Sequence, residues 1–299
     1  MRQPTGDWLR RFHLEHAGVR GVVARLDHSW REIVSHAPYP APVAALLGET
    51  LAASALFAGN IKLSGSISLQ LKSRGALSLV FAECSAEGEL RGLARYDGEF
   101  DDARIEPRAL GSDAVLAITI EGTEANARYQ GLVPLEGESF SAAFESYFAQ
   151  SEQLPTAIRI TVGPQSCSGM LVQQIATSGG HAGRDATPEF ERVSLMFRTL
   201  TDEELASLPP ETLLRRLFAE DDVRLHLELP LRFGCRCSRE RVARMLRTLG
   251  RDEVFASRLH DGVVEVECQF CNRQYRFDEN ELEALFAPRV EVEGPRTPQ

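Results

Sequence analysis

The sequence lacks the short motifs that mark many catalytic sites. It contains no Gly-rich phosphate-binding loop, no nucleophile elbow, and no acid/base pair that rises above chance. Its seven histidines form no convincing metal-binding pair, because nothing near His13 and His16 supports these two as ligands. We therefore expect the large N-terminal part of the chain to be non-catalytic.

The chain also lacks an excess of positive charge. It has 33 Lys and Arg against 43 Asp and Glu, a formal net charge of −10, and its only lysines are Lys62 and Lys72. A protein that binds nucleic acid or an anionic membrane needs a basic surface to meet the phosphates. The charge balance therefore argues against nucleic acid and membrane as main partners.

Long apolar runs are missing as well. No stretch approaches eighteen uninterrupted apolar residues, and residues 1–11 contain no apolar signal-peptide core, so we expect a cytoplasmic protein. In a reducing compartment, six cysteines are metal ligands or buried apolar side chains more often than a disulfide framework. Cys84 and Cys167 have no cysteine or histidine close in sequence, and we expect both to be buried or half-buried apolar side chains.

The other four cysteines form two pairs near the C-terminus. Cys235 and Cys237 enclose one residue, Cys268 and Cys271 enclose two, and thirty residues separate the pairs. Four such thiolates can surround one Zn²⁺ tetrahedrally at about 2.3 Å, which leaves no coordination position for a hydrolytic water. Two to four intervening residues are typical of structural zinc pairs, so the first spacing is unusual and specific. We predict one zinc ion per chain, bound by these four cysteines.

Hydrophobic periodicity predicts an α+β fold whose N-terminal domain mixes sheet and helix. At 299 residues, two or more domains are expected. Ala41–Ala58 reads as a buried helix, and Leu63–Leu71 alternates like a half-buried strand. Ser139–Gln150 places three phenylalanines at i, i+4 and i+8, a helical face that we assign to the core. Further strands are expected at Val19–Leu26, Ala76–Glu83, Glu89–Tyr96, Val115–Glu121, Ala127–Val133, Ala157–Val162 and Met170–Ile175.

A change of composition marks the end of that domain. Thr177–Asp185 is a Gly-rich hinge, and short helices are expected at Pro188–Leu200, from a capping box at Thr201–Glu204, and at Pro210–Glu220. Isolated helices shorter than about 12–15 residues are marginal in water, so these must dock on a neighbour to persist. The segment is either an ordinary interdomain linker or an amphipathic segment that can detach.

The last domain is expected to begin near Leu231. Ser238–Leu249 is predicted to be a helix with an N-cap at Ser238 and Gly250 at its C-terminus. A second helix at Asp252–Leu259, strands at Val263–Glu267 and Arg273–Phe277, and a short helix capped by Asp278 should follow. About sixty residues with few large apolar groups form a marginal core, and a structural metal is one usual remedy.

Two other classes of protein remain open for such a cysteine set. A nucleic-acid-binding zinc ribbon would use clustered basic residues, although acidic residues nearby and the acidic whole chain weaken this hypothesis. The arginines in question are Arg236, Arg239, Arg241, Arg244 and Arg247. A dithiol oxidoreductase would use Cys268 and Cys271 catalytically, but this pair follows a strand-like segment and does not start a helix.

Several stretches also match a known family. These are Leu46–Ala53, Glu83–Gly92, Tyr129–Gly137, Tyr147–Thr156 and Cys268–Phe277. Over essentially its whole length the sequence resembles the redox-regulated thirty-three-kilodalton heat-shock chaperone family, a bacterial holdase. The cysteine spacing matches, and the family's zinc ligands fall on Cys235, Cys237, Cys268 and Cys271. The clearest departure is the hinge at residues 179–183, which affects only the linker boundary.

The resemblance implies a chaperone and not an enzyme. In the resting cytoplasm it would be reduced, zinc-loaded and inactive. Oxidants would convert the thiolates to two disulfides, release zinc and unfold the linker. The oxidised homodimer would hold unfolding client proteins without ATP and pass them to ATP-dependent chaperones. The implied parts are a substrate-binding and dimerisation domain (1–178), a helical redox-switch linker (179–230), a zinc-binding redox-switch domain (231–292) and a tail (293–299).

We expect the disulfides to pair locally, as Cys235–Cys237 and Cys268–Cys271, because the partners in each pair are close in sequence. The ring closed by Cys-x-Cys is the tighter one, and a strained disulfide is more oxidising. The bond between Cys268 and Cys271 should therefore form first.

Overall fold

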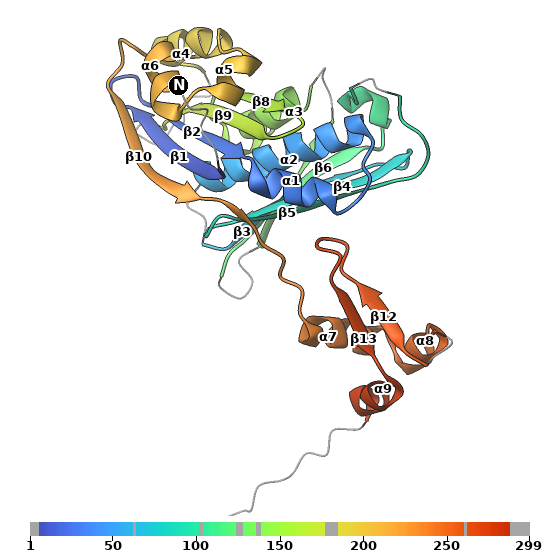
Figure 1. The fold of residues 1–299 in the computed structure, drawn as a ribbon. Helices are drawn as coiled ribbons and strands as arrows, with labels where there is room; N and C mark the ends of the chain where they lie inside the picture. Colours follow the sequence, from blue (N-terminus) through green and yellow to red (C-terminus); the bar gives the residue numbers. More distant parts are fainter. Residues whose placement is uncertain are drawn as a thin grey trace, which may run out of the picture. The chain divides into compact units, whose positions relative to one another are not determined.

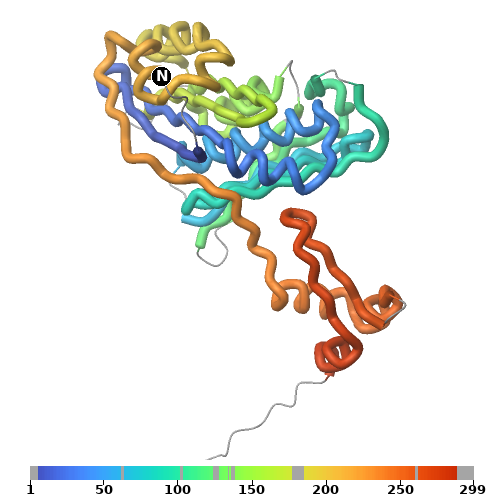
Figure 2. Tube along the Cα trace, in the orientation of Figure 1, coloured from blue at the N-terminus to red at the C-terminus, as the bar shows by residue number. Residues whose placement is uncertain are grey.

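The computed structural model describes residues 6–61, 64–101, 104–123, 128–135, 139–176, 185–259 and 262–287. The chain divides into two compact units, Met1–Cys235 and Arg236–Gln299. Figures 1 and 2 show the first unit in blue to orange and the second in darker orange to red.

Two sheets build the first unit. The five-stranded sheet has the order β10-β1-β2-β9-β8 and the six-stranded sheet has the order β11-β5-β4-β3-β6-β7. The strands of the first sheet are β1 (Trp8–Leu14), β2 (Val19–Leu26), β8 (Thr156–Val162), β9 (Cys167–Gln174) and β10 (Val223–Pro230). Those of the second are β3 (Ser66–Lys72), β4 (Leu77–Ser85), β5 (Glu89–Tyr96), β6 (Val115–Glu121), β7 (Arg128–Pro134) and β11 (Arg232–Phe233). All ladders are antiparallel except β11 with β5, which is parallel.

The central helix α2 (Ala41–Asn60) contacts strands of both sheets, among them β2 and β4. Seventeen of its 20 residues are buried, as expected for a helix that is apolar on every side. By length and composition alone it could cross a membrane, but 83% of that stretch is buried inside the protein. Phe57 of α2 packs edge-on against Phe144 and Phe148. The helix is therefore the centre of the main core.

The predicted phenylalanine face is confirmed as core. Phe140, Phe144 and Phe148 are each at most 2% exposed. Helix α3 (Phe140–Tyr147) starts at an N-cap serine and continues as one π-helical turn, η2 (Phe148–Glu152). A short helix α1 (His28–Ser35) and a 3₁₀ turn η1 (Pro107–Leu110) complete this part of the unit.

A second core covers the other face of the five-stranded sheet. Three short helices lie there: α4 (Pro188–Arg198), α5 (Asp202–Ser207) and α6 (Pro210–Leu217). Successive strand residues alternate between the two cores, as the pleat requires: Leu171 faces the first core, whereas Met170 and Val172 face the second. Figure 1 shows the helices gathered beside β1, β2 and β9. The short helices are thus docked, as their length requires.

Most predicted elements are present within a few residues of their predicted bounds, including the capping box at Thr201. Five elements of the first unit had not been predicted: β1, α1, η1, β10 and β11. The strand β10 lies at the edge of the five-stranded sheet, antiparallel to β1, in the segment expected to be a helical linker. Residues 177–184 of the predicted hinge lie outside the described residues.

The second unit contains a hairpin and three helices. The hairpin joins β12 (Val264–Glu267) and β13 (Gln274–Phe277), and the helices are α7 (Arg239–Leu249), α8 (Arg251–Ala256) and α9 (Glu279–Phe286). Ser238 caps α7 and Asp278 forms a capping box with α9, as predicted. Among the described residues of this unit, the core contains six buried side chains: Leu246, Val254, Val264, Tyr275, Phe277 and Leu282. Such a small core fits a domain that depends on a structural metal.

Candidate metal centre

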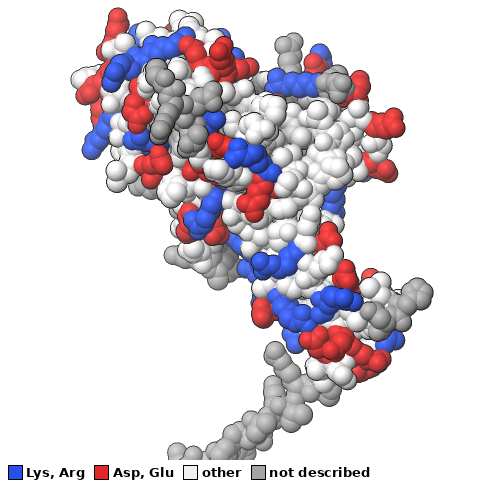
Figure 3. Space-filling view, viewed as in Figure 1, with Lys and Arg blue, Asp and Glu red and all other residues white. Residues whose placement is uncertain are grey.

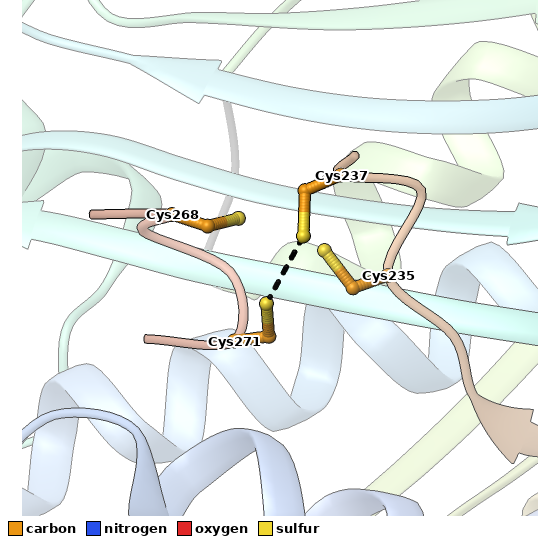
Figure 4. A group of neighbouring side chains, drawn as sticks. All are labelled: Cys235, Cys237, Cys268 and Cys271. Carbon is orange, nitrogen blue, oxygen red and sulfur yellow. Dashed lines mark hydrogen bonds between the residues drawn. The ribbon is translucent and has the colours of Figure 1, made fainter. Parts of the chain in front are cut away.

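The structure brings the four cysteines of the two pairs together. Cys235 and Cys237 lie between β11 and α7, and Cys268 and Cys271 lie in the turn between β12 and β13. Their sulfur atoms all lie within 4.8 Å of one another, and all four residues are half-buried. The side chains point toward one another from the two chain segments (Figure 4).

Backbone hydrogen bonds shape the turn that carries the second pair. The amides of Cys271 and Asn272 donate to the carbonyl of Cys268 at 3.2 and 2.8 Å, and the amide of Cys268 donates to Arg273 at 3.0 Å. Asn272 has φ of 54°, a left-handed conformation that asparagine tolerates better than most residues. The turn therefore holds both thiols on the same side of the hairpin end.

The sulfur spacing fits a tetrahedral zinc site. Four sulfurs at about 2.3 Å from a common centre lie roughly 3.8 Å apart. The sulfurs of Cys237 and Cys271 are 3.4 Å apart, and no pair in the group exceeds 4.8 Å. Soft thiolates favour zinc over magnesium or calcium. This group can close around one ion with only small side-chain adjustments.

A tyrosine and an arginine lie beside the cluster. The hydroxyl of Tyr275 donates to Cys237 Sγ at 3.0 Å, and Arg273 hydrogen-bonds to Tyr275. The hydrogen bond to Cys237 raises the pKa of Tyr275, so the phenol keeps the proton that it donates. The same tyrosine raises the pKa of Arg273, with Cys237 and Cys271 adding to the effect. Sequence reasoning missed both residues.

The two remaining cysteines are not part of the cluster. Cys84 and Cys167 are at most 1% exposed and lie in the main core, as predicted. Burial raises the pKa of Cys84 to about 12, and it also raises the pKa of Cys167. Both are therefore protonated thiols with little reactivity toward oxidants.

The arginines near the first pair take part in contacts within the second unit. Arg239 forms an ion pair with Glu281 at 2.6 Å and lies over the ring of Phe277. Arg241 and Arg247 donate to the backbone carbonyls of Arg236 and Leu285. Figure 3 shows acidic and basic side chains interspersed on this unit. These contacts engage Arg239, Arg241 and Arg247 within the unit, which weakens the case for a nucleic-acid-binding zinc ribbon.

The position of Cys268 and Cys271 also bears on the oxidoreductase alternative. They follow β12 and precede β13, so neither cysteine starts a helix. Reactive Cys-x-x-Cys pairs of thioredoxin type lie at a helix N-terminus, where the helix dipole lowers a thiol pKa. That activating feature is absent around these two described residues.

Comparisons with known proteins agree over nearly the whole chain. The family model described as Hsp33 protein matches residues 7–278. A 33 kDa chaperonin from Azotobacter vinelandii is 43% identical over 282 residues, covering 94% of this chain and 95% of the relative. One from Nitrosococcus oceani is 40% identical over 286 residues and covers 96% of each chain.

The fold has a counterpart among solved structures. The crystal structure of a 33 kDa chaperonin, a heat shock protein 33 homologue from Thermotoga maritima, matches with a TM-score of 0.78 at 23% identity. It covers 93% of this chain and 97% of the other. The fold, the four-cysteine cluster and the relatives together define a chaperone with a candidate zinc centre. The chain belongs to the Hsp33 family.

Proposed function

We propose that this protein is a redox-regulated, ATP-independent holdase with one Zn²⁺ per chain in its reduced form. The observation that carries the proposal is the cluster of four sulfurs within 4.8 Å, contributed by two chain segments. Three of the four cysteines belong to the second unit, whose core is small. Family membership supports the chaperone activity. The redox switch is our inference from the chemistry of the cysteines.

The switch depends on thiolate chemistry. Bound Zn²⁺ keeps the four sulfurs deprotonated, and a thiolate is the form that oxidants attack. One thiolate attacks an oxygen of a hydroperoxide, the O–O bond breaks, and a sulfenic acid and a hydroxide or alkoxide result. The second thiolate of the pair then attacks that sulfur, forms the S–S bond and expels hydroxide. Each pair loses two electrons and reduces one hydroperoxide.

We place the disulfides at Cys235–Cys237 and Cys268–Cys271. Each pair is close in sequence, so it closes without rearrangement of distant segments. In the reduced cluster Cys237 and Cys271 also lie close, 3.4 Å apart. Peptide mapping of the oxidised protein tests the pairing, and a bond between Cys237 and Cys271 would overturn it.

Loss of the metal should unfold the second unit. Structural zinc contributes about 10–16 kcal/mol in small zinc-dependent domains, whereas whole domains are stable by only about 5–15 kcal/mol. Two disulfides that close rings of three and four residues restore about 3–4 kcal/mol together. The six-residue core cannot make up the difference.

Release of the linker would then expose apolar surface. The helices α4 to α6 cover a sheet face that carries Trp8, Phe12 and Met170. Undocking them would uncover both this face and their own apolar sides, and a large apolar patch can bind a non-native protein. We propose that this surface lies between the domain at residues 1–178 and the linker at 179–230, and that residues 231–292 form the switch.

Further steps follow from the proposed activity. The oxidised protein would form a homodimer in the cytoplasm, hold unfolding clients during oxidative stress, and release them to ATP-dependent chaperones when reducing conditions return. The test is zinc content and suppression of client aggregation, measured on the same preparation before and after oxidation. Stoichiometric zinc without activity before oxidation, and activity without zinc after it, support the proposal. Equal activity in both forms contradicts it.

A further inference from the structure

We propose that Tyr275 slows oxidation of the Cys235–Cys237 pair by donating a hydrogen bond to the sulfur of Cys237. This inference rests on the proposed redox switch and identifies a positioning residue within it. The phenol oxygen lies 3.0 Å from Cys237 Sγ, within the usual range for a donor to sulfur. The two residues are 38 positions apart in sequence, so the fold creates this contact.

The position of Tyr275 is fixed on both sides of its ring. It lies on β13 opposite Val266 of β12. The ring is part of the small core of the second unit, and the residue is only 7% exposed. Its hydroxyl also hydrogen-bonds to the side chain of Arg273, an exposed residue two positions before it. Packing already holds the ring in place, so the hydrogen bond from the O–H to the sulfur costs little further side-chain entropy.

A hydrogen bond to a thiolate lowers its reactivity. The donor stabilises the negative charge on sulfur, and that charge is lost when the sulfur attacks an oxidant. Residues that hydrogen-bond to metal ligands orient those ligands and tune the metal site. If half of a charge-assisted hydrogen bond is lost in the transition state, attack slows by about three- to tenfold.

The reaction that is slowed is the first step at Cys237. The Cys237 thiolate attacks one oxygen of hydrogen peroxide, the O–O bond breaks, and hydroxide leaves with the electron pair. The Cys235 thiolate then attacks the sulfenic sulfur and expels a second hydroxide. The pair gives up two electrons, and with two protons the products are one disulfide and two waters. Removing the phenol O–H accelerates the first step and leaves the second pair unchanged.

The test is a Tyr275→Phe variant of the full-length, zinc-loaded protein. Hydrogen peroxide is added, samples are quenched by alkylation, and peptide mass spectrometry follows each disulfide separately. The expected result is an initial rate of Cys235–Cys237 formation, before zinc is released, about three- to tenfold above that of the wild type, with the initial rate at Cys268–Cys271 unchanged. Tyr129→Phe, at a half-exposed tyrosine of the first unit, is the matched control and should change neither rate.

A second variant separates the hydrogen bond from general loosening. Val264→Ala weakens the same small core without removing the phenol, so it should raise both disulfide rates together. Equal acceleration of both pairs in Tyr275→Phe, or no acceleration, overturns the inference. If the wild type still forms both disulfides and releases zinc, the proposed switch stands without a role for Tyr275. If neither wild-type pair forms a disulfide, the switch fails and the inference fails with it.

Discussion

The backbone amide of Gly234 donates a hydrogen bond to the carbonyl of Leu90 at 2.9 Å. Gly234 follows β11 and directly precedes Cys235, the first cysteine of the cluster. Together with the pairing of Arg232 and Phe233 against β5, this bond fixes the start of the cluster segment on the six-stranded sheet. Cys235 therefore follows directly after a segment that is held on the six-stranded sheet.

Substitution at Gly234 should weaken this attachment. A Cβ there would lie 2.9 Å from Cβ of Glu89, too close for either to stay in place. We expect Gly234→Ala to lower the free energy of unfolding by about 1–3 kcal/mol, because β11 must move away from β5. Urea denaturation of the reduced protein measures this loss in the free energy of unfolding. Gly75→Ala, where the nearest atom is 3.6 Å away, is the control, and an equal loss in both variants argues against the attachment.

Serine in place of a cluster cysteine should abolish tight zinc binding. Each change removes one of four thiolates, and a serine hydroxyl does not replace a soft sulfur ligand. Atomic absorption of purified Cys235→Ser, Cys237→Ser, Cys268→Ser and Cys271→Ser should find far less than one zinc per chain. The control is Cys84→Ser, in the main core, which should retain one zinc per chain. If the variant with all four cluster cysteines replaced also retains one zinc per chain, the assignment is wrong.

Loosening the linker helices should activate the reduced protein. Phe218 follows α6, is 1% exposed, and packs on Phe12 of β1 with ring centroids 6.2 Å apart. Phe218→Ala should cost about 3–5 kcal/mol of local stability. Suppression of client aggregation should then appear without oxidation while zinc stays bound.

The control for this prediction is Leu195→Ala on α4. Leu195 is 67% exposed, so its loss removes little packing. Activity that depends on oxidation to the same degree in Phe218→Ala and Leu195→Ala would contradict a role for linker undocking.

Acidification should weaken the pairing of β1 with β10. His13 Nδ1 lies 2.8 Å from His226 Nε2 across these strands. Burial lowers the pKa of His13, and the neighbouring His226 lowers it further. As the pH falls, the unfolded chain therefore takes up a proton at His13 before the folded chain does. The contribution of neutral His13 to the free energy of unfolding is complete above about pH 6.5 and decreases below that pH.

Unfolding of wild type between pH 8 and 5 tests this. His13→Gln should flatten the decline in stability below about pH 6.5, because the titrating group is gone. His16→Gln, at an exposed histidine, should leave the decline as in the wild type. A decline of the same size in His13→Gln and wild type would show that His13 is not responsible.

The features that the sequence predicted well depend on local patterns. Cysteine spacing alone indicated the cluster, because four thiols in two short pairs have few structural uses in a reducing compartment. The buried helix α2 was likewise predicted from its Ala/Leu composition, and the starts of α7 and α9 from the caps at Ser238 and Asp278. Caps and buried helices depend on residues that are neighbours in sequence.

The features that it missed depend on the fold. In β1 the adjacent Arg10 and Arg11 break the alternation, and the structure has a bulge at this place in the pairing with β10. The strand β10 does alternate, but its Leu227 is 94% exposed, and its partner β1 is more than two hundred residues earlier. Tyr275 meets Cys237 only because the hairpin folds back on the cluster.

We propose that oxidation unfolds the second unit and releases the linker helices from the sheet. Hydrogen exchange followed by mass spectrometry, on the reduced zinc-loaded and the oxidised zinc-free protein, tests it most directly. We expect protection to fall across α4 to α6 and β10, and across residues 236–287, while α2 and the six-stranded sheet around it stay protected. Unchanged protection from residue 185 to Phe286 after activation would contradict the account.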